Sequence, residues 1–308
     1  MEKRSVQAPA AVIMIRPHHF SPNQETAADN SFQQSGEGIS ADELASRAYS
    51  EATNVVDTLE GRGIKVHVFE DKGTETPDSV FPNNWFSTHS GGHVAIYPMF
   101  AENRRLERRT DVIEMLKENY RVQDIIDYSG LEPDGLFLEG TGAMVLDHID
   151  RVAYVTKSNR ADPVALERFC THFNYEPMAF DAFDENGTPV YHTNVLMCVA
   201  TDYVMISLEM MDDDDRRAEI IGRIESSGRA VIDLTRDQIA NFAGNALELQ
   251  SNDGRVLAIS SRAHNVLTAD QIAIIEGSTT ILPLYIPTIE LAGGSVRCML
   301  AGIHLLPR

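Results

Sequence analysis

One cysteine, one histidine and one glutamate stand in similar turns at widely separated places in the chain. Cys298 follows two glycines in AGGSVRCML, His192 lies in YHTNVLMCVA, and Glu139 opens the turn of LFLEGTGAMVLD. A thiol, an imidazole and a carboxylate together support nucleophilic catalysis, in which a thiolate attacks and the imidazole moves protons. A lone cysteine is more commonly an inert buried side chain. The interpretation therefore depends on whether the fold brings these three residues together.

The turns that carry these residues recur at a nearly constant distance. One polar residue from each turn gives Asn83, Glu139, His192, Asn245 and Cys298, which are separated by 56, 53, 53 and 53 residues. Each turn adjoins an apolar run with the length of a short strand. Regular spacing of this kind indicates a repeat architecture, in which each module buries one face against its neighbours.

Amphipathic segments that predict helices lie between the strand-like runs. In the first of them, Ser40 is placed to cap the helix and Glu43 to complete a capping box. Strand and helix alternate throughout, with no Pro/Ser-rich linker, so we predict one α/β domain, residues 1–308, of about five modules. If the modules close a ring, the recurring turns converge on its axis. The predicted helices span residues 40–63, 108–120, 162–173, 215–228 and 268–278.

The composition argues against several classes of partner. The chain has 46 acidic and 26 basic residues, and its net charge of −20 repels nucleic acid and anionic membrane surfaces. No run approaches the roughly 18 apolar residues of a membrane span, and the first apolar stretch is too short for a signal peptide. The three cysteines form no disulfide framework. We expect a cytoplasmic protein that binds neither nucleic acid nor membrane, and homo-oligomerisation stays open.

The histidines and glycines give no sign of a cofactor. His18, His19, His93, His148 and His304 lack the HxxxH type of spacing that places two metal ligands on one helical face. The glycine turns GTG and GGS match neither a P-loop nor GxGxxG. We therefore expect no metal and no other cofactor.

Six motifs, in their order along the chain, resemble one known superfamily. The chain is similar to guanidino-group-modifying enzymes, which include arginine deiminases, amidinotransferases and dimethylarginine hydrolases. Within them it most resembles the amidinotransferase-related citrulline-utilisation hydrolases, or citrulline ureidases. The resemblance implies a five-bladed α/β propeller with pseudo-fivefold symmetry, the pentein fold, which agrees with the period of about 53 residues. The motifs are MIRPHHFSPNQETAADNSFQ, DSVFPNNWFSTH, LEGTG, YHTN, GNALEL and GGSVRCML.

The resemblance implies a role for each member of the catalytic set. Cys298 is expected to be the nucleophile, His192 the general acid and base, and Glu139 the carboxylate that faces the planar head group of the substrate. Only a thiolate attacks efficiently, and a cationic His192 is the expected partner that stabilises it.

The resemblance also implies contacts to the α-amino acid end of the substrate. Arginine pairs with a carboxylate through two parallel hydrogen bonds and so fixes the far end of the molecule. One arginine of the adjacent pair 104–105 is expected in this role, and a solvated helix face is the alternative for that pair. The expected contacts are Asn83, Asn84, Arg104 or Arg105, and Arg160.

Two positions depart from the arginine deiminase pattern and bear on the substrate. Deiminases carry aspartate at the end of a PNLYFTRD-type motif and two residues after the catalytic histidine, where this chain has His89 and Asn194. A guanidinium with a single carboxylate partner in a desolvated pocket costs several kcal/mol. A neutral ureido group avoids this cost, so Asn194 and His89 are expected substrate contacts for citrulline. For His89, a purely structural place at a strand end is the alternative.

Three residues near the motifs are expected to be structural. Arg297 adjoins Cys298, but neighbouring side chains of an extended segment point to opposite faces, so a structural ion pair is expected for it. Cys170 and Cys198 lie in apolar helix and strand patterns and are expected to fill the core.

These expectations predict a hydrolase that converts citrulline into ornithine, ammonia and carbon dioxide through a covalent cysteine intermediate. An arginine deiminase or dihydrolase and an amidinotransferase need the same residues and remain alternatives. A catalytically inactive amino-acid sensor is a further alternative, which the intact cysteine, histidine and glutamate oppose. The order of these residues and the lack of a CGxCW element argue against a papain-type hydrolase.

Overall fold

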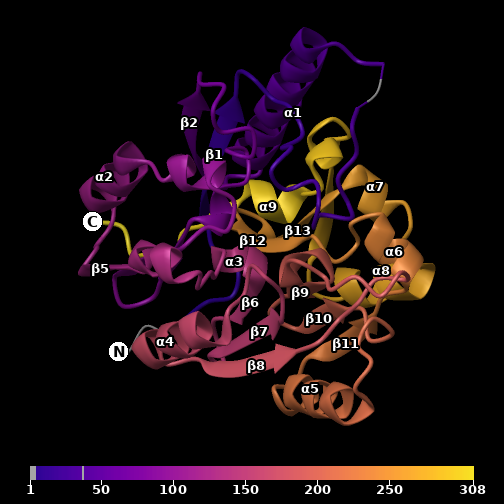
Figure 1. The fold of residues 1–308 in the computed structure, drawn as a ribbon. Helices are drawn as coiled ribbons and strands as arrows, with labels where there is room; N and C mark the ends of the chain where they lie inside the picture. Colours follow the sequence, from indigo (N-terminus) through magenta and orange to yellow (C-terminus); the bar gives the residue numbers. More distant parts are fainter. Residues whose placement is uncertain (1–4, 37) are drawn as a thin grey trace.

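The computed structural model describes residues 5–36 and 38–308, in which five small mixed sheets share one topology (Figure 1). In each sheet the first strand is antiparallel to the second, and the second is parallel to the third. The sheets are β15-β1-β2, β3-β4-β5, β6-β7-β8, β9-β10-β11 and β12-β13-β14. The strands are β1 (Ala11–Pro17), β2 (Lys65–Asp71), β3 (Phe86–His89), β4 (His93–Ile96), β5 (Asp124–Asp127), β6 (Met144–Asp147), β7 (Val152–Thr156), β8 (Glu176–Phe180), β9 (Met197–Val199), β10 (Tyr203–Ile206), β11 (Ala230–Asp233), β12 (Leu247–Ser251), β13 (Gly254–Ser260), β14 (Thr280–Leu284) and β15 (Ala301–Gly302).

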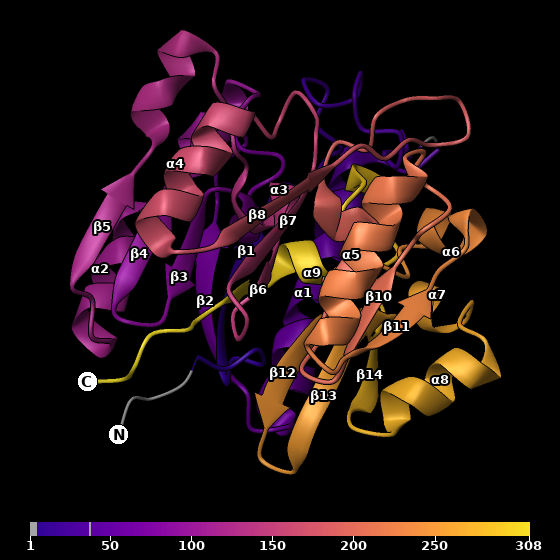
Figure 2. The same cartoon turned by 90° about the horizontal axis from the view of Figure 1, so that it is seen from below.

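A helix connects the two parallel strands of every sheet, because parallel strands require a crossover of a dozen or more residues. These are the five helices expected from the sequence, and they lie on the outside of the molecule (Figures 1 and 2). They are α1 (Ala41–Gly61), α2 (Thr110–Asn119), α4 (Pro163–Phe173), α5 (Asp214–Ser226) and α8 (Ala269–Glu276). The shorter helices and turns are η1 (Pro82–Asn84), η2 (Asn103–Glu107), η3 (Ser129–Asp134), α3 (Gly140–Ala143), η4 (Thr193–Val195), α6 (Arg236–Ala240), α7 (Ser261–His264), η5 (Ile289–Ala292) and α9 (Val296–Met299).

The cap of α1 is simpler than expected. Ser40 accepts a hydrogen bond from the backbone N–H of Glu43. The carboxylate of Glu43 instead pairs with Arg47 on the next turn. Complete capping boxes occur at Thr235 in α6 and at Thr268 in α8. Among the described residues, no helix combines the length and apolar character needed to cross a bilayer.

The two ends of the chain meet in one sheet. The C-terminal strand β15 pairs with β1 through Val12 and Ile13, which face Gly302 and Ala301. The first module is therefore completed by the last residues of the chain. Adjacent modules share hydrophobic cores, and one of these joins β1 and α1 to β12, β13 and β14. The last module thus packs against the first.

Each recurring turn lies directly before the first strand of its sheet. The turns η1, α3, η4 and α9 precede β3, β6, β9 and β15. They pack closely on one another: a Cβ at Gly140 would lie 2.5 Å from the backbone oxygen of Asn83, and one at Gly142 would lie 2.2 Å from Oδ1 of Asn84. These approaches, and the φ of +47° at Gly140, require glycine. The glycines of LEGTG therefore let the turns meet at the centre of the molecule, where α3 and α9 lie in Figure 1.

Candidate active site

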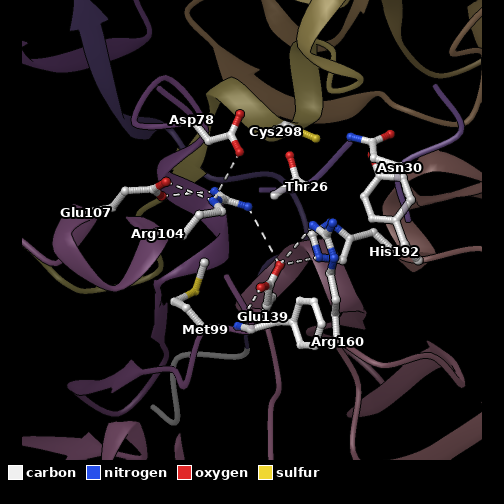
Figure 3. A network of polar contacts seen from close by, with 12 residues as sticks. Thr26, Asn30, Asp78, Met99, Arg104, Glu107, Glu139, Arg160, His192 and Cys298 are labelled. Carbon is white, nitrogen blue, oxygen red and sulfur yellow. Dashed lines mark hydrogen bonds and ion pairs between the residues drawn. The ribbon is translucent and has the colours of Figure 1, made fainter. Parts of the chain in front are cut away.

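Three turns from different modules bring Glu139, His192 and Cys298 to one place (Figure 3). Glu139 directly precedes α3, His192 directly precedes η4, and Cys298 lies within α9. All three are at most 3% exposed. His192 and Cys298 line a narrow cavity, and Glu139 is hydrogen bonded to His192. The structure thus joins the three residues that the sequence singled out.

Glu139 and His192 form a buried pair. Nε2 of His192 lies 2.8 Å from Oε2 of Glu139, and the other carboxylate oxygen accepts from the backbone N–H of Phe100 at 3.0 Å. Burial opposes ionisation of Glu139, but the guanidinium of Arg160 and the bond to His192 outweigh it and hold the pKa of Glu139 well below its usual range. The glutamate is therefore a carboxylate that can balance a positive charge on the imidazole.

Two opposing influences act on the pKa of His192. Burial lowers the pKa of His192 to about 4, although the hydrogen bond to Glu139 acts in the opposite direction. Burial therefore disfavours the cationic histidine that the sequence led us to expect beside the thiolate. A neutral imidazole can accept the thiol proton, and Glu139 then stabilises the imidazolium that forms.

Two amides donate hydrogen bonds to the sulfur of Cys298. Nδ2 of Asn194 lies 3.1 Å from Sγ, and Nδ2 of Asn245 lies 3.3 Å from it. Donors of this kind stabilise negative charge that develops on sulfur. The other two thiols lie within the hydrophobic cores, and burial raises the pKa of Cys170 and of Cys198 to about 12. The structure therefore separates one polar thiol from two apolar ones, as the sequence predicted.

Arg160 lines the cavity and is fully buried. Its Nη1 lies 3.6 Å from Oε2 of Glu139, and its Nε donates to Asp29 at 2.9 Å. The guanidinium also lies over the ring of Tyr191, 4.8 Å from the ring centre. Arg160 is thus held in place by three neighbours, and both Nε and Nη2 of its guanidinium donate to Asp29.

The two adjacent arginines have different surroundings. Arg104 is buried, lines the cavity, makes a bidentate pair with Glu107 at 2.8 and 2.9 Å, and lies 3.7 Å from Glu139. Arg105 is partly exposed, donates to the backbone oxygen of Met99, and does not line the cavity. Of this pair, the structure therefore brings only Arg104 to the predicted site.

The two asparagines of the PNN turn also differ. Asn84 lines the cavity, and with its amide turned so that the oxygen faces Arg104 it accepts from both terminal guanidinium nitrogens at 3.0 Å. Asn83 is buried beneath it and does not line the cavity, and its backbone oxygen accepts from the hydroxyl of Thr141 at 3.1 Å. Asn83 therefore supports the turn.

His89 lies away from the cavity. Its ring packs 4.3 Å from that of Phe173, and its Nε2 is 2.7 Å from the hydroxyl of Ser87. The expected substrate contact at His89 is thus not formed, because β3 directs the ring into an aromatic cluster. The structure instead agrees with the alternative given for His89, a structural place at the end of a strand.

A segment near the N-terminus covers the cavity. Thr26 and Asn30 line it, Asn30 donates to the backbone oxygen of Ala292 at 3.2 Å, and Asp29 pairs with Arg160. The motif at residues 14–33 marked this segment in the sequence, but its residues had no assigned role. Its polar residues have no strand or helix pattern that would have indicated where they point.

Asp78 is a further cavity residue that sequence reasoning missed. One of its carboxylate oxygens accepts from Nδ2 of Asn23 at 2.8 Å and lies 3.6 Å from Nε of Arg104. Its other oxygen is buried and has no hydrogen-bond partner among the described residues. Its position at the start of DSVFPNN was the available signal. Among the described residues, no group of three His, Cys, Asp or Glu side chains is arranged to hold a metal ion.

The amino-acid sequence matches one protein family over most of its length. The family described as N,N dimethylarginine dimethylhydrolase, eukaryotic, matches residues 16–305. A search of curated proteins found no significant match.

Solved structures share the fold at low sequence identity. The N-terminal domain of ArgZ, a cyanobacterial arginine dihydrolase solved as a cysteine-to-serine mutant bound to substrate, has a TM-score of 0.73 at 17% identity, covering 95% of this chain and 97% of that one. Unliganded AgrE has a TM-score of 0.75 at 17% identity, covering 97% of this chain and 40% of AgrE.

A third solved structure is the dimethylarginine dimethylhydrolase (DDAH) of Pseudomonas aeruginosa, a cysteine-to-serine mutant complexed with citrulline. It has a TM-score of 0.63 at 12% identity and covers 98% of this chain and 100% of that one. These similarities confirm the α/β fold and the resemblance to guanidino-group-modifying enzymes. The chain belongs to the N,N-dimethylarginine dimethylhydrolase family, and it is a hydrolase of the class that acts on non-peptide C–N bonds.

Proposed function

We propose that this protein hydrolyses the ureido group of citrulline, or of a closely related ureido amino acid, to ornithine, ammonia and carbon dioxide. The observation that carries the proposal is the pair of amides on the nucleophile, because Asn194 and Asn245 both donate to Sγ of Cys298. The carbon that is attacked must lie next to this sulfur. A neutral ureido group is stable beside amides, whereas a guanidinium would gain no counter-charge from these two residues.

The α-amino acid end of the substrate contacts the charged side of the cavity. Arg104 and Arg160 offer guanidinium groups to the α-carboxylate. Asp78 offers its unpartnered oxygen to the α-ammonium. Asn84 also lines the cavity and contacts Arg104. Fixing both charges of the amino acid orients the ureido carbon for attack.

In the first half-reaction Cys298 attacks the ureido carbon and its proton passes to His192. The imidazolium, stabilised by Glu139, then donates this proton to the δ-nitrogen as the C–N bond breaks. Ornithine leaves, and the carbamoyl group stays on sulfur.

In the second half-reaction His192 accepts a proton from water, and the hydroxide attacks the S-carbamoyl carbon. The C–S bond breaks, the thiolate regains the proton, and carbamic acid leaves and decomposes to ammonia and carbon dioxide. One ammonia is formed per ornithine.

Arginine is the second candidate substrate, and one observation favours it. Four carboxylates, from Asp29, Asp78, Glu107 and Glu139, surround only two guanidiniums, so the cavity region tolerates a further positive charge. A dihydrolase would remove ammonia from arginine before the second hydrolysis, and it would release two ammonia molecules per ornithine.

Product stoichiometry separates these activities. The protein is incubated with citrulline, arginine or their Nα-acetyl derivatives, and ornithine-type amine, citrulline and ammonia are measured together. The proposal expects one ammonia per ornithine from citrulline and slower turnover of arginine. Citrulline accumulating from arginine, with no turnover of citrulline, would identify a deiminase and overturn it. Ornithine formed only when an acceptor amine is present would identify a transferase.

The proposal also includes the arrangement of the whole chain. We propose that residues 1–308 form one domain, in which the five modules close a five-bladed propeller. Pairing of β15 with β1 and the shared core between the first and last modules support this closure. The three free cysteines support action in the reducing cytoplasm.

A further inference from the structure

A second cavity lies on the other side of α9 from the active site. Five strands contribute to its lining, β3, β6, β9, β12 and β15, which are the first strands of the five sheets. Its volume is about 40 Å³, enough for a small ion, and it shares no lining residue with the cavity at Cys298. Within α9, Cys298 lines the first cavity and its neighbour Arg297 lines the second. The two cavities are therefore separate sites on the two sides of one short helix.

Arg297 is an uncompensated cation in this second cavity. Its Nη1 donates to the backbone oxygen of Leu300 at 3.0 Å, and it makes no ion pair with any carboxylate in residues 5–36 and 38–308. The structural ion pair expected for Arg297 is thus not formed within this part of the chain. Burial lowers the pKa of Arg297. Arg297 is partly exposed, but a charge that is largely removed from water and has no partner is unfavourable, so this position favours a counter-ion from solution.

The neighbours of Arg297 in the cavity are neutral hydrogen-bonding groups. His148 and His304 stack with ring centres 3.7 Å apart, and burial together with the positive charge nearby keeps the pKa of both below the usual range. Thr88 and Gln7 add polar side chains, and no lining residue among those described is acidic. The site therefore carries one net positive charge, from Arg297.

We propose that this second cavity binds a small planar monoanion of the bicarbonate or carboxylate type, held by Arg297. The guanidinium edge formed by Nε and Nη2 has no partner among the described residues, whereas Nη1 is engaged with Leu300. This edge matches two coplanar oxygens and favours them over a spherical ion. One positive charge matches a monoanion, and the imidazoles of His148 and His304, which also line the cavity, can donate to its remaining oxygen. The inference does not depend on which substrate the active site hydrolyses.

The test is a calorimetric titration with sodium bicarbonate, sodium formate and sodium chloride. Cys298 is alkylated first. The added group blocks the active-site cavity, so that the anions cannot bind to the arginines there. The proposal expects saturable millimolar binding of bicarbonate and formate, one per chain, and at least tenfold weaker binding of chloride. No saturable binding, or equal binding of chloride, would overturn it.

Variants locate the bound anion. Arg297→Gln is expected to weaken bicarbonate binding at least tenfold, whereas Arg308→Gln, which removes an arginine bonded to the backbone of Tyr120, should leave it unchanged. Circular dichroism checks that Arg297→Gln folds. If it does not, Ala246→Val serves as the second test, because Ala246 lines the cavity and a larger side chain fills it. Unchanged binding in the folded variant would contradict the assigned site.

Discussion

Nδ2 of Asn194 donates a hydrogen bond to Sγ of Cys298 at 3.1 Å, although the two residues are 104 positions apart. Asn194 belongs to the turn before β9 and Cys298 to the turn before β15. The surroundings of the nucleophile are therefore built by a module other than its own. This contact is also where the chain departs from the arginine deiminase pattern, so it bears directly on substrate choice.

Asn194→Asp is expected to reverse the substrate preference. A carboxylate about 3 Å from the sulfur repels a developing thiolate and attracts a guanidinium. We expect kcat/KM for citrulline to fall at least about tenfold, and arginine to bind more tightly. Steady-state kinetics with both substrates, together with the rate of iodoacetamide labelling of Cys298, measures both effects.

Asn241→Asp is the matched control for that substitution. Asn241 lies outside the active site and accepts a hydrogen bond from Arg262 at 2.9 Å. The arginine therefore compensates the added negative charge. We expect kcat/KM for citrulline and for arginine to stay as in the wild type. If Asn194→Asp leaves the citrulline-to-arginine ratio unchanged as well, the charge argument for a ureido substrate fails.

Glu139→Gln is expected to abolish most activity while keeping the shape of the site. The amide cannot balance the imidazolium that His192 forms during proton transfer, and a positioned acid–base group contributes about 10²- to 10⁴-fold. The substitution also leaves Arg104 and Arg160 with one buried counter-charge fewer. We expect kcat to fall by about 10²-fold or more, and urea unfolding to show a loss of about 3 kcal/mol. A fully active variant would remove Glu139 from the mechanism.

His89→Phe is expected to leave catalysis intact and to reduce acid sensitivity. Burial holds the pKa of His89 well below its value in the unfolded chain. His89 therefore binds a proton in the unfolded state but not in the folded state. As a result, the free energy of unfolding decreases as the pH falls below about 6.5. Between pH 7 and pH 5 the variant should lose about 2 kcal/mol less unfolding free energy than the wild type. Urea denaturation at both pH values measures this difference.

Activity assays of the same variant decide the role of His89. Its ring lies among Phe169, Phe173 and Tyr175 rather than at the cavity, so kcat/KM for citrulline should change by no more than about threefold. A large rise in KM with normal stability would instead indicate a substrate contact.

The sequence predicted the α/β fold and the meeting of Glu139, His192 and Cys298 at one place, for a physical reason. Each module needs a turn before its first strand, and that turn repeats at about 53 residues, so residues such as Glu139, His192 and Cys298 could be aligned without any structure. The crossover helices follow from the same repeat, and α1, α2, α4 and α5 each have an apolar face, whereas α8 is apolar over more of its surface.

Side-chain direction within the turns could not be predicted in the same way. Arg104 and Arg105 are adjacent and chemically equivalent in the sequence, but only Arg104 faces Glu107 and Asp78. His89 ends the motif that contains Asn84, yet the alternation along β3 turns its ring elsewhere. Asp29 and Asn30 belong to a covering segment without periodicity, so only tertiary contacts fix their positions.

Arg160→Lys and Arg105→Lys form a matched pair that tests substrate binding. Lysine keeps the charge but loses the planar fork that pairs with a carboxylate. At Arg160 we expect KM for citrulline to rise by about tenfold or more, with a smaller change in kcat. At Arg105, which bonds backbone oxygens outside the cavity, both constants should stay within about twofold of the wild type. Equal effects at the two positions would argue against Arg160 as the carboxylate contact.

Mass spectrometry of the enzyme quenched during turnover tests the central claim most directly. Protein mixed with citrulline, stopped in acid within milliseconds and digested, should carry one carbamoyl group on the peptide that contains Cys298. The adduct should be absent from Cys298→Ser and from the peptides of Cys170 and Cys198. Turnover of citrulline with no carbamoyl group on Cys298 at any quench time would contradict the covalent mechanism proposed for this site.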